Sequence, residues 1–227
     1  MTAKDQTCVV IAAFNEASMI ARVVAEVRHV GHRVIVVDDG SKDRTAQVAK
    51  AAGATVIQHP FNLGQGAALQ SGIELALAIG AEVIVTFDAD GQHDAADISR
   101  LASALAEENA DFVLGSRFLE ASSNIPRLRR LLLKAATVFT RVTTGLRLTD
   151  AHNGLRAMTR RGASAIRLRQ NRMAHASEFL AQIGASGLHY VERPVTIHYS
   201  ASSIAKGQKT SDSVVILLDL FARALYR

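Results

Sequence analysis

Two aspartates at the end of an apolar run are the side chains in this sequence best suited to chemistry. Residues 83–87 are all β-branched or aromatic and none is charged. Asp88 and Asp90 follow them. Such a run predicts a buried strand that brings carboxylates to its C-terminal end, where ligands bind in open α/β sheets. If the strand continues, Asp88, Asp90 and Gln92 share one face, and their hard oxygens suit Mg²⁺ or Mn²⁺. A polar turn with Asp94 as a helix N-cap is the alternative.

Polar residues also follow the first two apolar runs. Asn15 and Glu16 follow the first, and Asp38 and Asp39 end the second. A carboxylate at this edge can accept hydrogen bonds from the N–H of a nucleobase or from ribose hydroxyls. One aspartate is expected to serve the turn, and we assign the other, Asp39, to a ligand.

The loop over residues 62–68 opens a helix with Gly64 and Gly66. Glycines allow a backbone to approach a ligand closely, and a helix N-terminus favours anionic groups. The loop is not a dinucleotide-binding fingerprint, because Leu69 stands where the third glycine would be.

The elements expected to position these residues alternate along the chain. We predict strands over 7–13, 33–38, 54–58, 82–87 and 111–115. We predict helices over 16–29, 66–79 and 95–108, and a further helix that begins at Ser41 or Asp43 and ends at residue 52. This order predicts an α/β fold, a mostly parallel sheet with helices on both faces. After Arg117 we predict a polar connection (119–124), a basic helix (128–140), a strand (155–159), a helix (177–183), an edge strand (189–199) and an amphipathic helix (213–226).

Five segments in this order resemble the motif set of family-2 glycosyltransferases: 13–16, 37–45, 62–66, 88–92 and 115–117. The nearest branch is the dolichol-phosphate mannose synthase-like enzymes, including bacterial polyprenyl-phosphate sugar transferases. The resemblance covers about residues 7–160. It implies a GT-A (Rossmann-like) fold with a C-terminal acceptor-side extension, a nucleotide-diphosphate sugar donor, inversion at the anomeric carbon, and Mg²⁺ or Mn²⁺ at the Asp-x-Asp. Ala12 stands where the family usually has proline.

The resemblance also assigns residues to roles. The nucleotide sugar is expected to contact Ala13, Asn15, Glu16, Asp39, Asn62, Gly66, Asp88 and Ala89, and the metal ligands are Asp88, Asp90 and Gln92. The segment 150–156 resembles the branch's acidic-to-Gly-x-Arg segment, with Asn153 where serine or threonine is usual. We assign Arg117 and Arg156 to phosphate, because a guanidinium offers planar bidentate donors. The expected catalytic residues are Asp90, Arg117, Arg156 and Glu178.

The choice of acceptor depends on whether the second half supplies a general base. A hydroxyl acceptor needs one, whereas a phosphate monoester, with a second pKa of about 6, is already ionised at neutral pH. The candidates are Glu178, Asp150, His175 and His152, of which Glu178 is the best placed. None is compelling, which favours a polyprenyl phosphate as acceptor. Transfer to a saccharide or protein hydroxyl is the alternative.

Charge is distributed unevenly along the 227 residues. Residues 1–120 sum to −7 and residues 121–227 to +12, so the second part is expected to meet anions. Basic stretches at 126–130 and 202–209 and the apolar run at 214–225 predict contact with an anionic membrane surface, and docking on protein or on another subunit fits the apolar run equally well. A nucleic-acid-binding module is an alternative of another class. Aromatic residues form only 5% of the chain and no recognised nucleic-acid motif occurs, so we expect no nucleic acid.

We therefore predict a GT-A domain over 1–200, made of a nucleotide-sugar half (1–118) and an acceptor-side half (119–200). A basic loop and amphipathic helix follow over 201–227. The single cysteine, Cys8, lies in an apolar run and is expected to be a core residue. The sequence has neither a secretory signal pattern nor about 20 uninterrupted apolar residues. These features predict a cytoplasmic enzyme that is peripheral on the membrane face.

Overall fold

The computed structural model describes residues 7–119, 137–138, 140–151, 153–170 and 174–198. Its strands are β1 (Thr7–Ala13), β2 (Arg33–Asp38), β3 (Thr55–Gln58), β4 (Val83–Asp88), β5 (Phe112–Ser116), β6 (Arg156–Thr159) and β7 (Tyr190–Pro194). Its helices are α1 (Ile20–His29), α2 (Thr45–Ala51), α3 (Gln65–Ala78), α4 (Ala96–Glu107), α6 (Arg160–Ala165) and α7 (Ala174–Ser186), and residues 137–138 and 140–144 are also helical.

The described strands form one sheet in the order β3-β2-β1-β4-β6-β5-β7. Neighbouring strands are parallel except at β6, which runs antiparallel to both β4 and β5. The sheet is therefore mostly parallel, as predicted. The first residue of β6, Arg156, pairs with Thr86 near the C-terminal end of β4, so the inverted strand begins at the edge where β4 ends.

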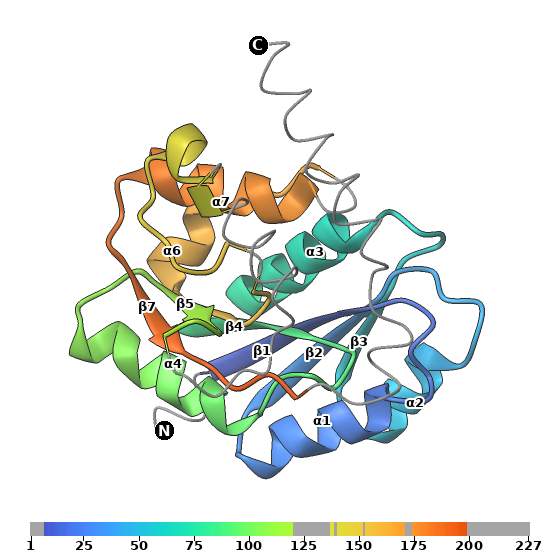
Figure 1. The fold of residues 1–227 in the computed structure, drawn as a ribbon. Coiled ribbons are helices and arrows are strands. Elements are labelled where there is room, and N and C mark those ends of the chain that lie inside the picture. Colours follow the sequence, from blue (N-terminus) through green and yellow to red (C-terminus); the bar gives the residue numbers. More distant parts are fainter. Residues whose placement is uncertain (1–6, 120–136, 139, 152, 171–173, 199–227) are drawn as a thin grey trace.

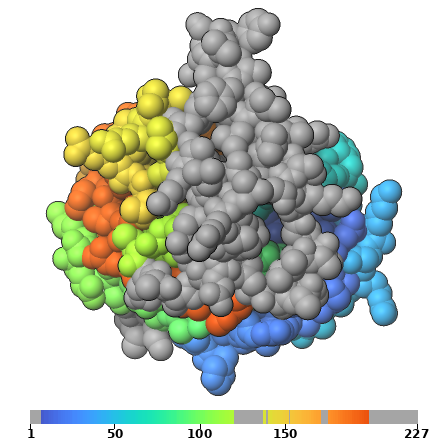
Figure 2. Space-filling model, viewed as in Figure 1, coloured from blue at the N-terminus to red at the C-terminus, as the bar shows by residue number. Residues whose placement is uncertain are grey.

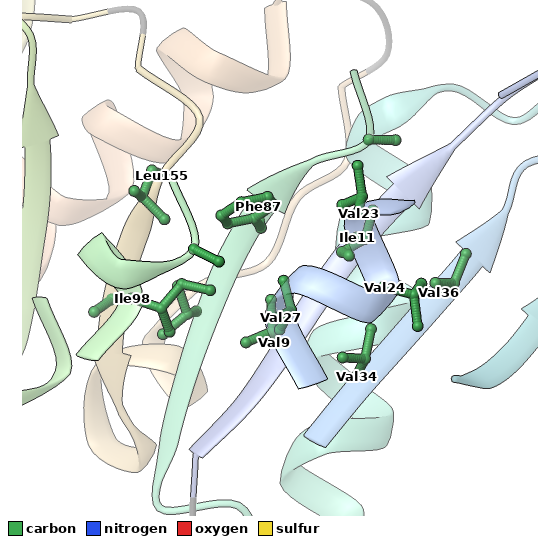
Figure 3. Close-up of a cluster of buried hydrophobic side chains, with 14 of the residues drawn as sticks. Val9, Ile11, Val23, Val24, Val27, Val34, Val36, Phe87, Ile98 and Leu155 are labelled. Atoms are coloured by element: carbon green, nitrogen blue, oxygen red, sulfur yellow. The ribbon is translucent and has the colours of Figure 1, made fainter. Parts of the chain in front are cut away.

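The two faces of the sheet are covered by different helices because apolar side chains alternate along each strand. On β1, Val9 and Ile11 pack with α1, α2 and α4, and Figure 3 shows this cluster. Cys8 and Val10 point to the other face, where α3, α6 and α7 lie (Figure 1). Cys8 is a fully buried core residue, as expected.

The first and second parts of the chain are not separated in space, because β6 lies between β4 and β5 in the sheet. In the space-filling view, the blue residues of the first part lie at the bottom and right, whereas its green residues lie at the left beside yellow and orange residues of the second part (Figure 2). The sheet joins the two parts, because β6 and β7 extend the sheet begun by β1 to β4. The edge position predicted for the strand around Pro194 is confirmed, since β7 is the last strand of the sheet.

Several predicted boundaries were wrong. The first helix begins at Ile20 rather than residue 16, because residues 17–19 form a turn in which the N–H of Met19 donates to the carbonyl of Glu16. The N–H groups of Glu16 and Ala17 bind the side chains of Thr45 and Asp43 and tie this turn to the second loop. Helix α6 was not predicted. The helix at the 177–183 segment is longer than expected and spans Ala174–Ser186.

Some predictions lie outside the described residues. These are the connection after residue 119, most of the basic helix at 128–140, and the whole of the 201–227 segment. None of the described helices has the length and apolar character that crossing a bilayer requires.

Candidate active site

A cavity of about 570 Å³ lies at the C-terminal ends of β1, β2 and β4. Its size is typical of small-molecule sites. The residues around it come from both parts of the chain: Ala12, Ala13, Phe14, Glu16, Asp39, Asn62, Gly64, Gln65, Leu69, Thr86, Asp88, Ala89, Asp90, Gln92, His93, Arg117, Asn153, Gly154, Arg156, His175, Ala176 and Ile197. Most of the predicted site residues are thus brought together.

Asp88 and Asp90 both line this cavity, but they do not share the face of a continuing strand. Strand β4 ends at Asp88, and the chain turns at Ala89 and Asp90. The turn is fixed by Asp90 Oδ1, which accepts the N–H of Gln92 at 3.0 Å. The two carboxylates are therefore brought together by a turn and not by the strand parity that the sequence suggested.

The electrostatics of the two aspartates differ. Burial would raise the pKa of Asp88, but the hydrogen bond from His93 and the charges of His93 and Arg156 outweigh it and leave that pKa lowered. Burial and the nearby charge of Asp88 raise the pKa of Asp90. A cation bound near Asp90 would relieve the repulsion between the Asp88 and Asp90 carboxylates.

His93 is a site residue that the sequence reasoning missed. Its Nε2 lies 2.9 Å from Asp88 Oδ2, its side chain is only 3% exposed, and its ring packs against Phe87. The chain beyond β7 holds this segment, because His93 pairs with Ile197 in an isolated bridge. The only available signal was an imidazole within five residues of Asp88, and the sequence analysis assigned it no role.

Arg156 reaches the cavity because β6 is antiparallel. Its guanidinium is buried, lies 4.5 Å over the ring of Phe179 and donates through Nε to the carbonyl of Asn153. Burial lowers its pKa to about 10 despite the charges of Asp88 and Asp150, so it stays a cation at neutral pH. A phosphate group would offset the cost of burying this charge.

Gly154 brings the backbone before β6 against Asp88. A Cβ on Gly154 would lie 2.3 Å from Asp88 Oδ2 and 2.5 Å from its Oδ1. The Gly154 carbonyl accepts a hydrogen bond from Thr86 Oγ1 at 2.7 Å. The absence of a side chain at position 154 is therefore what allows Asp88 its observed position.

Arg117 is held at the cavity by Asp150. Its Nε donates to Asp150 Oδ2 at 2.6 Å, and both side chains are buried. The 149–150 backbone is in turn held by Glu192 on β7, which accepts the N–H groups of Thr149 and Asp150. Asp150, one of the candidate bases, is therefore the ion-pair partner of Arg117.

On the opposite side of the cavity, Glu16, Asp39 and Asn62 lie where the nucleotide was predicted to bind. Asp38 is buried under the turn, accepting the N–H of Ser41 and the amide of Gln58. Asp39 lines the cavity and also accepts N–H groups of the loop before α3. The assignment of Asp39 rather than Asp38 to a ligand agrees with this geometry and stays a prediction.

Three predicted site residues lie elsewhere. Asn15 does not line the cavity; it joins the first two loops, because its Oδ1 accepts the N–H of Lys42 and its own N–H binds Ser41. Gly66 is buried under the segment before α7, where a Cβ would lie 2.3 Å from the carbonyl of Gln170. Glu178 also lies outside the cavity lining, and its Oε2 accepts the N–H groups of Arg169 and Gln170.

These corrections have physical causes. Gly66 serves packing between α3 and the chain before α7, and Gly64, with φ 99°, is the glycine that reaches the cavity. Glu178 holds a backbone turn, so its carboxylate is not used in the mechanism proposed below. His175 does line the cavity, and His152 lies outside the described residues.

The residues around Asp88 fit a divalent cation. Two carboxylates and the side chain of Gln92 line the same wall, and the repulsion that raises the pKa of Asp90 would be relieved by a cation. Within the described residues no group of three acidic, histidine or cysteine side chains meets at one point. An ion held by Asp88, Asp90 and Gln92 would have three protein ligands, fewer than the six that Mg²⁺ takes, so positions would stay open for phosphate oxygens.

Comparisons with known proteins identify the family of the chain. Residues 8–167 match the model of Glycosyl transferase family 2. A UDP-N-acetylglucosamine–dolichyl-phosphate N-acetylglucosaminyltransferase of Methanococcus voltae is 30% identical over 95% of this chain and 93% of its own length. A polyprenol monophosphomannose synthase of Mycolicibacterium smegmatis is 33% identical over 69% of this chain and 62% of its own.

The fold is shared with solved glycosyltransferases. Glucosyl-3-phosphoglycerate synthase from Mycobacterium tuberculosis, in complex with Mn²⁺, uridine diphosphate and phosphoglyceric acid, gives a TM-score of 0.67 at 20% identity, covering 96% of this chain and 80% of that one. The likeness confirms the predicted GT-A fold. The family match spans most of the described sheet and the cavity at its edge, and the chain belongs to glycosyl transferase family 2.

Proposed function

We propose that the protein transfers a sugar from a nucleotide-diphosphate sugar to a polyprenyl phosphate, with inversion and with Mg²⁺ or Mn²⁺. The observation that carries this proposal is the meeting of Asp88 and Asp90 with Arg117 and Arg156 in one cavity. Carboxylates there suit a metal-bound diphosphate, and arginines beside them suit a second phosphate.

The donor lies, in this proposal, on the side of the cavity formed by β1, β2 and β4. Asp39 accepts an N–H of the base, Glu16 and Asn62 line the ribose region, and Ala13 and Ala89 leave room for the nucleotide. Asp88, Asp90 and Gln92 hold the divalent ion, which when bound neutralises charge on the departing diphosphate. His93 orients Asp88 through its hydrogen bond.

A phosphate acceptor fits the opposite wall. Among the described residues, those after Ser116 that line the cavity include Arg117, Arg156 and His175 but no carboxylate. An ionised phosphate needs no general base, and the two buried guanidinium groups of Arg117 and Arg156 would bind it. The relatives named for dolichyl-phosphate and polyprenol products support this acceptor class. A polyprenyl phosphate would bring the enzyme to a membrane surface, on its cytoplasmic face.

The reaction is then a single displacement. A phosphate oxygen of the acceptor forms the new bond to the anomeric carbon as the bond to the diphosphate oxygen breaks. The bonding electrons leave with the nucleoside diphosphate, and no proton has to be removed from the acceptor. Arg117 and Arg156 hold the attacking phosphate, which lowers the entropic part of the barrier.

The test is sugar transfer to a short polyprenyl phosphate with Mn²⁺, comparing wild type with Asp90→Ala. We expect turnover to fall by about 100-fold or more, the typical effect of removing one electrostatic contact to a developing charge. Asp94→Ala is the matched control, because Asp94 lies outside this cavity lining and its Oδ1 accepts the N–H of Ala96 at the start of α4. Full activity in Asp90→Ala would refute the assignment.

Transfer to a saccharide or protein hydroxyl remains a second candidate because His175 lines the cavity from α7 and could accept a proton. Turnover with a saccharide acceptor, lost in His175→Gln while nucleotide binding is kept, would favour this candidate. Turnover with polyprenyl phosphate that His175→Gln leaves unchanged would favour the first.

A further inference from the structure

The side chains of Asp39, His59 and Ser71 form a hydrogen-bonded chain away from the proposed metal ligands. His59 Nδ1 lies 2.7 Å from Asp39 Oδ1, and His59 Nε2 lies 3.0 Å from Ser71 Oγ. The side chains of His59 and Asp39 are only 8% and 4% exposed. An ionised carboxylate only accepts, so Nδ1 carries the proton, and the Ser71 hydroxyl donates to Nε2.

This order of residues is also found in nucleophilic triads, but its position differs from one. Asp39 lines the 570 Å³ cavity, whereas neither His59 nor Ser71 does. Ser71 lies within α3 and its oxygen faces the imidazole. The member of the chain that reaches ligand space is therefore the carboxylate, and the other two act on it.

The hydrogen bonds leave Asp39 little capacity for a ligand. Oδ1 accepts His59 Nδ1 and the N–H of Leu63 at 2.9 Å, and Oδ2 accepts the N–H of Gly64 at 2.7 Å. A carboxylate has about four acceptor positions. Three are used, so one position on Oδ2 remains.

One acceptor position distinguishes between nucleobases. Guanine offers two adjacent donors, N1–H and the 2-amino group, which pair with both oxygens of a carboxylate. Uracil offers a single N–H between two carbonyls. A carboxylate whose Oδ1 is already filled can satisfy the donor of uracil, and it leaves one guanine donor unpaired.

We propose that His59 and Ser71 are positioning residues that fill Oδ1 of Asp39 and so select a uracil over a guanine nucleotide. The proposal rests on the proposed function, because it requires the nucleotide to bind at Asp39. It adds to that function a donor class and two residues that touch neither the sugar nor the diphosphate.

The first measurement is calorimetric binding of UDP, GDP and N3-methyl-UDP to the full chain with Mn²⁺. We expect UDP to bind about tenfold or more tightly than GDP, since an unpaired buried donor costs at least one to two kcal/mol, and about 1.4 kcal/mol is tenfold. N3-methyl-UDP, which lacks the N–H, should lose a similar factor. In Asp39→Ala the UDP and N3-methyl-UDP affinities should converge.

Variants of the chain test the positioning role. In His59→Leu the GDP-to-UDP ratio of dissociation constants should fall by about tenfold, because Oδ1 becomes available to guanine. His59→Asn keeps an N–H near the Nδ1 position and should restore part of the selectivity. Ser71→Ala is a smaller change that keeps the test decisive if His59→Leu does not fold, and it should shift the ratio in the same direction. His189→Asn is the matched control, since His189 is exposed and outside the cavity lining.

The possible outcomes distinguish a failure of this proposal from a failure of the proposed glycosyl transfer. A loss of thermal stability in the His59 and Ser71 variants with an unchanged GDP-to-UDP ratio would show a purely structural role and overturn the inference. Tighter binding of GDP than UDP by wild type would also overturn it while leaving the proposed glycosyl transfer intact. Failure of both nucleotides to bind with Mn²⁺ would overturn both.

Discussion

Gly154→Ala adds one methyl group at the point where the backbone meets Asp88. The new Cβ would lie 2.3 Å from Asp88 Oδ2, whereas ordinary van der Waals contact begins at 3.4 Å. The carboxylate therefore has to move by about 1 Å. Oδ2 is also the oxygen bound by His93 Nε2 at 2.9 Å, so the movement breaks or lengthens that hydrogen bond.

The size of the effect follows from these contacts. A hydrogen bond to a charged group contributes about 1.5 to 3 kcal/mol, so the free energy of unfolding should fall by about 2 kcal/mol. Misplacing a group at a reaction centre by about 1 Å costs roughly 100-fold in rate. We therefore expect moderate destabilisation together with a loss of turnover of about 100-fold.

The assay is sugar transfer with Mn²⁺ titrated at saturating donor, beside a thermal melt. Gly80→Ala is the matched control, because Gly80 has φ 80° and a Cβ there meets nothing within 4 Å. It should lose about 1 kcal/mol of stability through backbone strain and keep full turnover. Wild-type Mn²⁺ dependence and turnover in folded Gly154→Ala would refute the placement of Asp88 in the reaction.

Three further variants test other parts of the structure. Arg156→Met should keep or raise the melting temperature, because it removes a buried cation and retains contact with Phe179. Its turnover should fall by about 100-fold, and unchanged turnover would exclude Arg156 from the reaction. Glu178→Gln should keep kcat within about twofold, since Glu178 lies outside the cavity lining, and a large fall in kcat with intact donor binding would instead favour a hydroxyl acceptor. Burial raises the pKa of the Cys8 thiol to about 11, so at pH 8 only about one thiol in a thousand is ionised. Alkylation of Cys8 should therefore be slow in the native protein and fast in denaturant. Equal alkylation rates would contradict its burial.

The sequence was informative about elements and less so about their directions. Alternating strand and helix patterns predicted the sheet through β5, because the central strands contain continuous apolar runs, such as Val34 to Val37 on β2. The direction of β6 could not be predicted, because a strand of four residues has the same pattern in either orientation. Its antiparallel pairing depends on contacts with β4 and β5, which are distant in sequence.

The site shows the same division. Asp88 and Asp90 were predicted to lie at the same place and do so, since Asp88 ends β4 and Asp90 lies in the turn that follows it. Asn15 and Gly66 were assigned to the ligand because they lie in two of the segments that carry the resemblance, and the Asn15 side chain and the Gly66 position face protein instead. His93 was missed because its role depends on the distance between its ring and Asp88, which no spacing rule specifies.

The order of the strands also explains how opposite charges come to share one cavity. β1, β2 and β4 bring Glu16, Asp39 and Asp88 to the edge, and β5 and β6 bring Arg117 and Arg156. Because β4 and β6 are neighbours, the change from negative to positive side chains falls between them. Were β6 parallel to β4, Arg156 at its start would lie roughly 10 Å away, at the far end of the strand. The inverted strand therefore places Arg156 on the same side of the sheet as Asp88 and Asp90, an arrangement that the proposed transfer from a diphosphate to an acceptor phosphate requires.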